Sequence, residues 1–199
     1  MIEAVGRYCG KINGLMVTKP SKGEVVELRL SGDSSRLVDG KKYFITAYMD
    51  ATYDRETGAV FRARLQSYEV APEEAVEFAS YKGVFRVNEA VGSTDDRSGK
   101  EIAFYRCDAF SPDLSKVELF GDSGWVTLAM SKAVSRVNHR AGDLVYARGR
   151  LYHKCKVIGG ESCYELCVWV SEYYKLDGAE YWENVRAAHY RTSQRKHTK

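Results

Sequence analysis

Apolar and polar residues alternate along most of this chain with a period of two, which is typical of half-buried β-strands. The alternation is clearest in residues 141–176, AGDLVYARGRLYHKCKVIGGESCYELCVWVSEYYKL. Gly159-Gly160 interrupts it, and a Gly-Gly pair favours a two-residue hairpin turn because both residues accept positive φ. The segment therefore predicts a long β-hairpin.

The turn fixes which residues of the two strands lie opposite each other. A two-residue loop places Tyr152 opposite Cys167 and Arg150 opposite Trp169. One face of the hairpin then carries cations and rings: Tyr146, Arg148, Arg150, Tyr152, Lys154, Lys156, Cys167 and Trp169. The other face is the expected core side: Val145, Ala147, Gly149, Leu151, Tyr164, Leu166, Val168 and Val170. A slip of one residue would mix the two sets, so the pattern specifies this register.

A surface of alternating cations and rings suits a single-stranded nucleic acid, because Arg and Lys hold phosphates while unpaired bases stack on rings. The same residue types are also common on any solvated sheet face, and Tyr is a good strand former. Patterning alone leaves both interpretations open.

Shorter alternating segments predict further strands at residues 4–12, 24–30, 43–49, 59–70, 84–91, 101–110, 117–120 and 125–130. On the strand 59–70, strict alternation places Arg62, Arg64, Gln66 and Tyr68 on one face, which gives a second cationic and aromatic stripe. Helices are expected at residues 72–79 and 179–191, the first because Pro72 and the acids after it suit a first helical turn.

The second half of the chain resembles the bacterial single-stranded DNA-binding protein family. The resemblance rests on Gly142, Val145, Tyr146, Gly149 and Leu151, which follow the form G-x-x-V-Y-x-x-G-x-L, and on Gly124–Leu128, where Trp125 lies in a segment like the family's third strand. It implies that residues 131–140 form the family's helix after that strand. It covers residues 84–176 and implies an OB fold, single-stranded DNA binding and self-association. Two features depart from the family: Lys156 stands near a position that is usually aromatic, and the chain ends in basic RAAHYRTSQRKHTK instead of an acidic tail.

Taken together, the segments predict an all-β protein built from OB-fold Greek-key barrels, two in tandem, with a short C-terminal helix. The expected division is an N-terminal OB-like domain at 1–71, a short helix or linker at 72–83, an OB domain at 84–176, and a helix with a basic tail at 177–199. A single OB barrel carrying an N-terminal β extension is the alternative architecture.

Composition and charge indicate a folded protein and show where its positive charge lies. A hydrophobic content of 44% with 14 Tyr, 7 Phe and 3 Trp is enough for a packed core. The net charge is +3, and residues 178–199 account for all of it with five Lys or Arg and two acids. Attraction to a polyanion would therefore come from a local stripe and the tail. No apolar run approaches 18 residues and the five Cys suit a reducing compartment, so we expect a cytoplasmic protein with no membrane association.

Catalytic and metal chemistry find little support in the sequence. His153, Cys155, Cys163 and Cys167 are close enough in sequence for zinc, but strand parity places the first two and the last two on opposite faces. Asp95-Asp96 lies in a Gly- and Ser-rich loop that is typical of a solvated turn. No Walker A motif and no G-x-G-x-x-G occurs, and no His accompanies a nucleophile in a recognisable motif. We expect no enzymatic activity, no metal, no cofactor and no small-molecule substrate.

The function predicted from these observations is non-catalytic binding and protection of single-stranded DNA in replication or recombination, in a protein of a phage or another mobile element, and as a homo-oligomer. The expected phosphate contacts are Arg62, Arg64, Arg148, Arg150, Lys154 and Lys156, and the expected stacking residues are Tyr68, Trp125, Tyr146, Tyr152 and Trp169. Two alternatives stay open: a single-stranded RNA-binding OB protein, and a β-rich structural or assembly protein such as a virion component.

Overall fold

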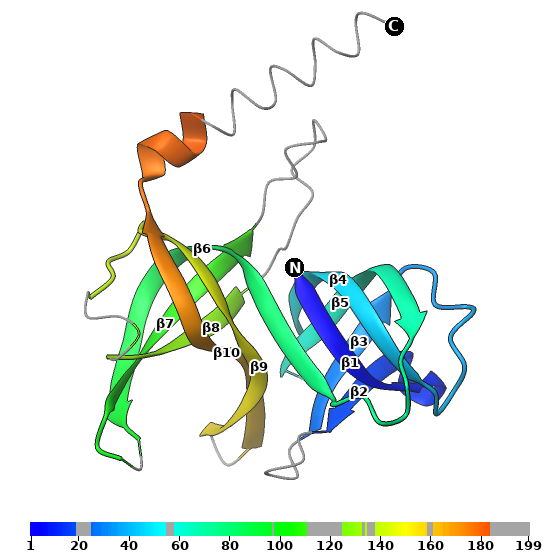
Figure 1. The fold of residues 1–199 in the computed structure, drawn as a ribbon. Helices are drawn as coiled ribbons and strands as arrows, with labels where there is room; N and C mark the ends of the chain where they lie inside the picture. The colour runs from blue at the N-terminus through cyan, green and yellow to red at the C-terminus, as the bar shows by residue number, and fades with distance from the viewer. Residues whose placement is uncertain are drawn as a thin grey trace, which may run out of the picture.

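The computed structural model describes residues 1–18, 25–54, 58–96, 98–110, 125–132, 134, 138–158 and 161–183. For residues 50–54, 58–61, 110, 125, 153–158 and 161–166 only the backbone is described. Ten strands form one continuous hydrogen-bonded sheet that closes on itself twice (Figure 1).

The first closed circuit contains the first five strands. They are β1 (Ile2–Cys9), β2 (Gly14–Thr18), β3 (Val25–Ser31), β4 (Lys42–Asp54) and β5 (Gly58–Val70). Their spatial order is β1-β2-β3-β5-β4, and β4 pairs with β1 again to close the barrel. Only β3 and β5 run parallel to each other. The predicted strand at 4–12 is in fact two strands, because the short 3-10 helix η1 (Gly10–Ile12) reverses the chain before β2.

The second circuit repeats the first. Its strands are β6 (Phe78–Asp95), β7 (Glu101–Phe110), β8 (Trp125–Ser131), β9 (Leu144–Ile158) and β10 (Glu161–Leu176). The order is β6-β7-β8-β10-β9 with β9 paired back to β6, and only β8 and β10 are parallel. Two closed five-stranded circuits of the same order confirm the prediction of tandem OB-fold barrels. They also exclude the alternative of a single barrel with an N-terminal extension.

Strand β6 joins the two barrels. Its first residues pair with β1 on one edge, from Ile2 with Tyr81 to Val5 with Phe78, while Ser80 and the residues after it pair with β9 on the other edge. Figure 1 shows β1, β6 and β9 next to one another across the middle of the molecule. The inward faces of the two barrels therefore lie on the same side of one sheet, and their buried side chains form a single hydrophobic cluster that includes Ile2, Tyr81 and Phe85.

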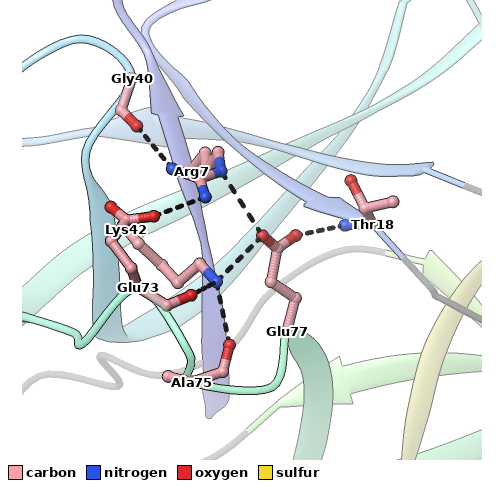
Figure 2. Close-up of polar contacts among 7 residues, drawn as sticks. All are labelled: Arg7, Thr18, Gly40, Lys42, Glu73, Ala75 and Glu77. Atoms are coloured by element: carbon pink, nitrogen blue, oxygen red, sulfur yellow. Dashed lines mark hydrogen bonds and ion pairs between the residues drawn. The ribbon is translucent and has the colours of Figure 1, made fainter.

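The helix predicted at 72–79 does not form. Residues 73–75 form a turn, in which the Ala75 amide donates to the Pro72 carbonyl, and β6 begins at Phe78. A buried cation holds this segment (Figure 2): the Lys42 ammonium donates to the carbonyls of Glu73 at 2.6 Å and Ala75 at 3.0 Å. Tertiary contacts thus override the local helix signal of a Pro followed by acids. The division of the chain into domains stays a prediction, and β6 crosses the expected boundary at residues 83 and 84.

Two charged partners complete this linker contact. The Glu77 carboxylate lies 3.6 Å from Lys42 Nζ and accepts a 2.8 Å hydrogen bond from the Thr18 amide. Arg7 donates to Glu73 at 2.6 Å and to the Gly40 carbonyl at 3.1 Å (Figure 2). The hydrogen bond from Arg7 lowers the pKa of the Glu73 carboxyl below its usual range. The linker is therefore attached to β1, β2 and β4 of the first barrel.

The remaining predicted helices are described only in part. The helix expected at 131–140 does not form in its described residues: residue 131 ends β8, residues 132 and 134 are turn residues, and residues 138–140 are not helical. Residues 133 and 135–137 lie outside the described ranges. Residues 178–183 are helical, and Asp177 caps their N-terminus by accepting from the amides of Ala179 and Glu180. The rest of the expected helix, the basic tail and the strand predicted at 117–120 lie outside the described residues. Within the part of the chain that the structure describes, no helix is long and apolar enough to cross a membrane.

Candidate nucleic-acid interface

The hairpin of β9 and β10 has the register that the sequence predicts. Tyr152 pairs with Cys167 and Arg150 pairs with Trp169, and two residues separate the last pair, Ile158 and Glu161. The predicted core side is buried wherever its side chains are described: Val145, Ala147, Gly149, Leu151, Val168 and Val170. On the opposite face, Arg148 and Arg150 are exposed. For these residues, the alternation in the sequence correctly predicts which side chains face the core and which face outward.

Two aromatic pairs flank these arginines on the outer face. The rings of Tyr152 and Trp169 lie 6.3 Å apart at 62° to each other. The rings of Tyr146 and Tyr174 lie 6.2 Å apart at 33°. Tyr146 and Tyr152 are six residues apart on one strand, a separation of about 20 Å at 3.3 Å per residue. The outer face therefore has rings at both ends and Arg148 and Arg150 between them.

Sequence reasoning missed Tyr174, because strict alternation assigns it to the core side. A β-bulge at Ser171 shifts the register between Val170 and Glu172, so that Tyr173 points toward the core and Tyr174 lies outside opposite Tyr146. Tyr174 is 57% exposed. Its hydroxyl donates to Glu172 at 2.8 Å, and this hydrogen bond raises the pKa of the phenol. One inserted residue changes the face of every residue after it.

The strand beside β9 adds charge to the same face. Ser80 and Lys82 of β6 pair with Arg150 and Arg148. Lys82 is bound to the Glu3 carboxylate at 2.6 Å. Glu172 lies opposite Arg148 on β10. The cationic character of this face therefore depends mainly on Arg148 and Arg150.

One part of the predicted face is covered. Cys167 is fully buried, although alternation placed it outside with Tyr152 and Trp169. Its neighbours on β8 on the same outer face, Thr127 and Ala129, are buried as well. The first barrel lies close to this strand, since β5 and β10 have Cα atoms within 8 Å of each other. The candidate interface is thus limited to the side of the hairpin that faces β6.

The predicted stripe on the first barrel is only partly correct. Arg62 and Arg64 lie on the outside of β5, where Arg62 is exposed and the Arg64 guanidinium lies 5.6 Å from the centre of the Tyr48 ring. Tyr68 does not join them. A bulge in β5 between the partners of Thr46 and Ala47 leaves Gln66 without a partner, and the following residues change face.

Tyr68 consequently packs against the core, with its ring 6.0 Å from that of Tyr43 in an edge-on arrangement. It is not available on the face that the sequence assigned to it. The three remaining predicted residues have side chains outside the described set. Their strand positions are known: Lys154 lies opposite Glu165, Lys156 opposite Cys163, and Trp125 opposite Asp108.

Metal ligation finds no further support. Among the described residues, no group of three or more His, Cys, Asp or Glu side chains could hold a metal ion. The side chains of His153, Cys155 and Cys163 lie outside the described set, but the register pairs His153 with Leu166 and Cys163 with Lys156. Cys107 is buried in the second barrel, and desolvation raises the pKa of its thiol.

Comparison with solved structures finds proteins of similar fold. The wild-type single-stranded DNA binding protein from Thermus aquaticus superposes with a TM-score of 0.56 and 12% sequence identity, over 88% of this chain and 92% of that chain. The chain has the fold of a single-stranded DNA binding protein. A deletion variant of the same Thermus aquaticus protein gives the same TM-score and identity over 93% of its chain.

The likeness includes strands of both barrels, and so extends beyond residues 84–176, where the sequence resemblance was recognised. No family model matches the sequence. No curated protein matches it either.

Proposed function

We propose that this protein binds single-stranded DNA and catalyses no reaction. The observation that carries the proposal is the outer face of β9 and β10, where the exposed Arg148 and Arg150 lie between two aromatic pairs. That face belongs to a barrel whose fold matches proteins named for single-stranded DNA binding.

The physical roles divide between charge and ring area. Arg148 and Arg150 would neutralise phosphates and release counterions, which gives affinity without sequence preference. The pairs Tyr152–Trp169 and Tyr146–Tyr174 would stack on unpaired bases, a contact worth about 1–3 kcal/mol per base. Duplex DNA offers no exposed base faces, so this surface favours a single strand.

The wider role is part of the same proposal. The protein protects single-stranded DNA during replication or recombination in the cytoplasm, as a homo-oligomer and on behalf of a mobile element. The likeness in fold to single-stranded DNA binding proteins supports the binding role. The basic C-terminal residues of the sequence fit an additional arm for phosphates.

Fluorescence anisotropy with labelled oligo-dT tests the proposal. Tyr152→Ala is expected to weaken binding about tenfold, the lower part of the range for one lost stack. Arg148→Gln and Arg150→Gln should each make the log-log salt slope shallower by about 0.7. Arg29→Gln is the matched control, because Arg29 is an exposed strand arginine on the first barrel that is paired with Glu27 at 2.8 Å.

The proposal is wrong if the full-length protein does not bind oligo-dT at low salt. Equal affinity for duplex DNA would contradict the stacking role. Tighter binding of oligo-U than of oligo-dT would favour RNA as the ligand. The structural or assembly alternative predicts binding of none of the three.

A further inference from the structure

The outer face of the hairpin continues without interruption onto the first barrel. Ser80 of β6 is paired with Arg150 on one side and with Glu3 of β1 on the other. Glu3 is in turn paired with Thr46 of β4. Residues directly opposite each other share a face of the sheet. The outer surfaces of β10, β9, β6, β1 and β4 therefore form one surface across the junction of the barrels (Figure 1).

An aromatic pair lies on the first-barrel side of this surface. Phe78 and Phe44 are both partners of Val5, and their rings lie 6.4 Å apart at 53°. Val5, which lies between them in the sheet, is buried. Phe78 remains 38% exposed, so part of its ring is open to a ligand.

The position of Phe78 connects it to the proposed interface. It lies two residues before Ser80 on β6, and Tyr152 lies two residues after Arg150 on β9. The pairing of β6 with β9 ends at Ser80 and Arg150. Phe78 and Tyr152 are the next outer-face residues of these two strands, one on each side of the point where the strands separate. A strand that stacks on Tyr152 thus reaches Phe78 by crossing the point where β6 leaves β9 and pairs with β1.

The nearby carboxylates are mostly neutralised. Glu3 is bound to Lys82, and Glu77 is held by Lys42 and the Thr18 amide. Glu69, opposite Phe44 on β5, is exposed on the far side of the ring pair. A phosphate approaching from β9 therefore meets Arg150 and Ser80 before it meets an acid.

We propose that Phe78 and Phe44 form a second base-stacking platform, onto which a single strand bound at β9 and β10 continues across β6. This inference rests on the proposed function. It replaces Tyr68, the residue that the sequence indicated on the first barrel, with a ring pair that only the pairing of β1 with β6 brings next to the hairpin.

The test compares two oligonucleotides with one set of variants of the full-length protein. A short oligo-dT of about 6 nucleotides can occupy the hairpin face alone, and one of about 20 nucleotides can cover both barrels. Phe78→Ala is expected to lower affinity for the long oligonucleotide about tenfold and to leave the short one unchanged. Phe78→Tyr keeps the ring and should bind both normally, whereas Phe78→Leu keeps apolar area and should behave like the Ala variant.

Val70→Ala is the matched control, because Val70 is an apolar side chain of the first barrel that is 67% exposed and belongs to no ring pair among the described residues. Tyr152→Ala is expected to weaken both oligonucleotides. If Tyr152→Ala does so and Phe78→Ala weakens neither, the second platform is refuted while the proposed function stands. If the protein binds neither oligonucleotide, the proposed function itself fails.

A measurement of molar mass tests whether the Phe78–Phe44 pair contacts a second copy of the chain instead of DNA. Light scattering of the wild type and of Phe78→Ala gives their molar masses in solution. A lower mass for Phe78→Ala, with unchanged affinity for the long oligonucleotide, would assign the ring pair to contact between copies of the chain and overturn the inference. An unchanged mass with weakened long-oligonucleotide binding supports it.

Discussion

Replacing Lys42 with Met is expected to destabilise the whole protein. The Lys42 side chain is only 6% exposed, and its ammonium group donates to the carbonyls of Glu73 and Ala75 and lies 3.6 Å from Glu77. Met keeps the apolar stem and removes the charge and all three donors. The carbonyls of Glu73 and Ala75 would then lose the hydrogen-bond donor that they share (Figure 2). Water reaches this site poorly and would not replace that donor.

The structure sets the size of the effect. Each buried carbonyl left without a donor costs about 1–3 kcal/mol, and removing one partner of a buried ion pair costs about 3–5 kcal/mol. Glu77 keeps its hydrogen bond from Thr18, which places the loss near the low end of that range, at about 3 kcal/mol. A chain of this length loses about 2–4 °C in Tm for each kcal/mol, so Tm should fall by about 6–12 °C.

Urea and thermal unfolding followed by circular dichroism measure this loss. Lys41→Met is the control, since Lys41 is the exposed neighbour and its replacement should change stability by less than about 0.5 kcal/mol. The double variant of Lys42→Met and Glu77→Gln should recover part of the loss, because no carboxylate is then left without its cation. Equal stability of Lys42→Met and Lys41→Met would show that the linker is not held by this cation.

Four further expectations follow from the described residues. Leu151→Ala should cost about 2–5 kcal/mol because Leu151 is fully buried, and a smaller loss than for its exposed-face neighbours would refute the register. Gly149→Ala should cost about 1–3 kcal/mol, since a Cβ there would lie 2.2 Å from the Trp169 carbonyl oxygen; wild-type urea unfolding would contradict the close approach of the strands. Burial lowers the pKa of His139 below 6.5, so the unfolded chain binds a proton that the folded one refuses. Stability should therefore fall as pH drops below about 6.5, by at most about 1.4 kcal/mol per pH unit, and the slope should be smaller in His139→Phe. Removing residues 191–199 should leave Tm unchanged and, if the tail is a binding arm, make the salt slope shallower by about 0.7 per lost contact; superimposable titrations would exclude the arm.

The hairpin could be predicted from the sequence because its information is local. A two-residue loop sets the register, and alternation then decides the face of each residue. That reasoning correctly paired Arg150 with Trp169 and correctly buried Leu151 and Val168. The fold class followed from the number of strands and the resemblance of residues 84–176.

The faces of Tyr68 and Tyr174 could not be predicted from alternation, and the physical reason is the same for both: one residue is inserted into the strand before them. The bulge at Gln66 turned Tyr68 inward, and the bulge at Ser171 turned Tyr174 outward. A bulge is defined by what the partner strand does, so one strand read alone cannot reveal it. Cys167 is likewise buried on a face that alternation along its own strand assigns to the outside.

Long-range pairing also decided the linker and the second ring pair. The acids after Pro72 suit a helix locally, but Lys42 engages their carbonyls from a strand about 30 residues away. Phe44 and Phe78 are unremarkable in sequence, and they become neighbours only because both strands pair with Val5. An aromatic residue at the start of a strand after a turn is too common a signal to identify such a pair.

The shared strand has a consequence for how this protein folds and how it can be divided. Because β6 pairs with β1 from Ile2–Tyr81 to Val5–Phe78, a cut within the linker would leave unpaired backbone amides and carbonyls along β1 on one half and along the start of β6 on the other. Unpaired strand edges template association with other chains. The two barrels should accordingly unfold in one cooperative transition, and each half made separately should self-associate or aggregate rather than persist as a stable monomer.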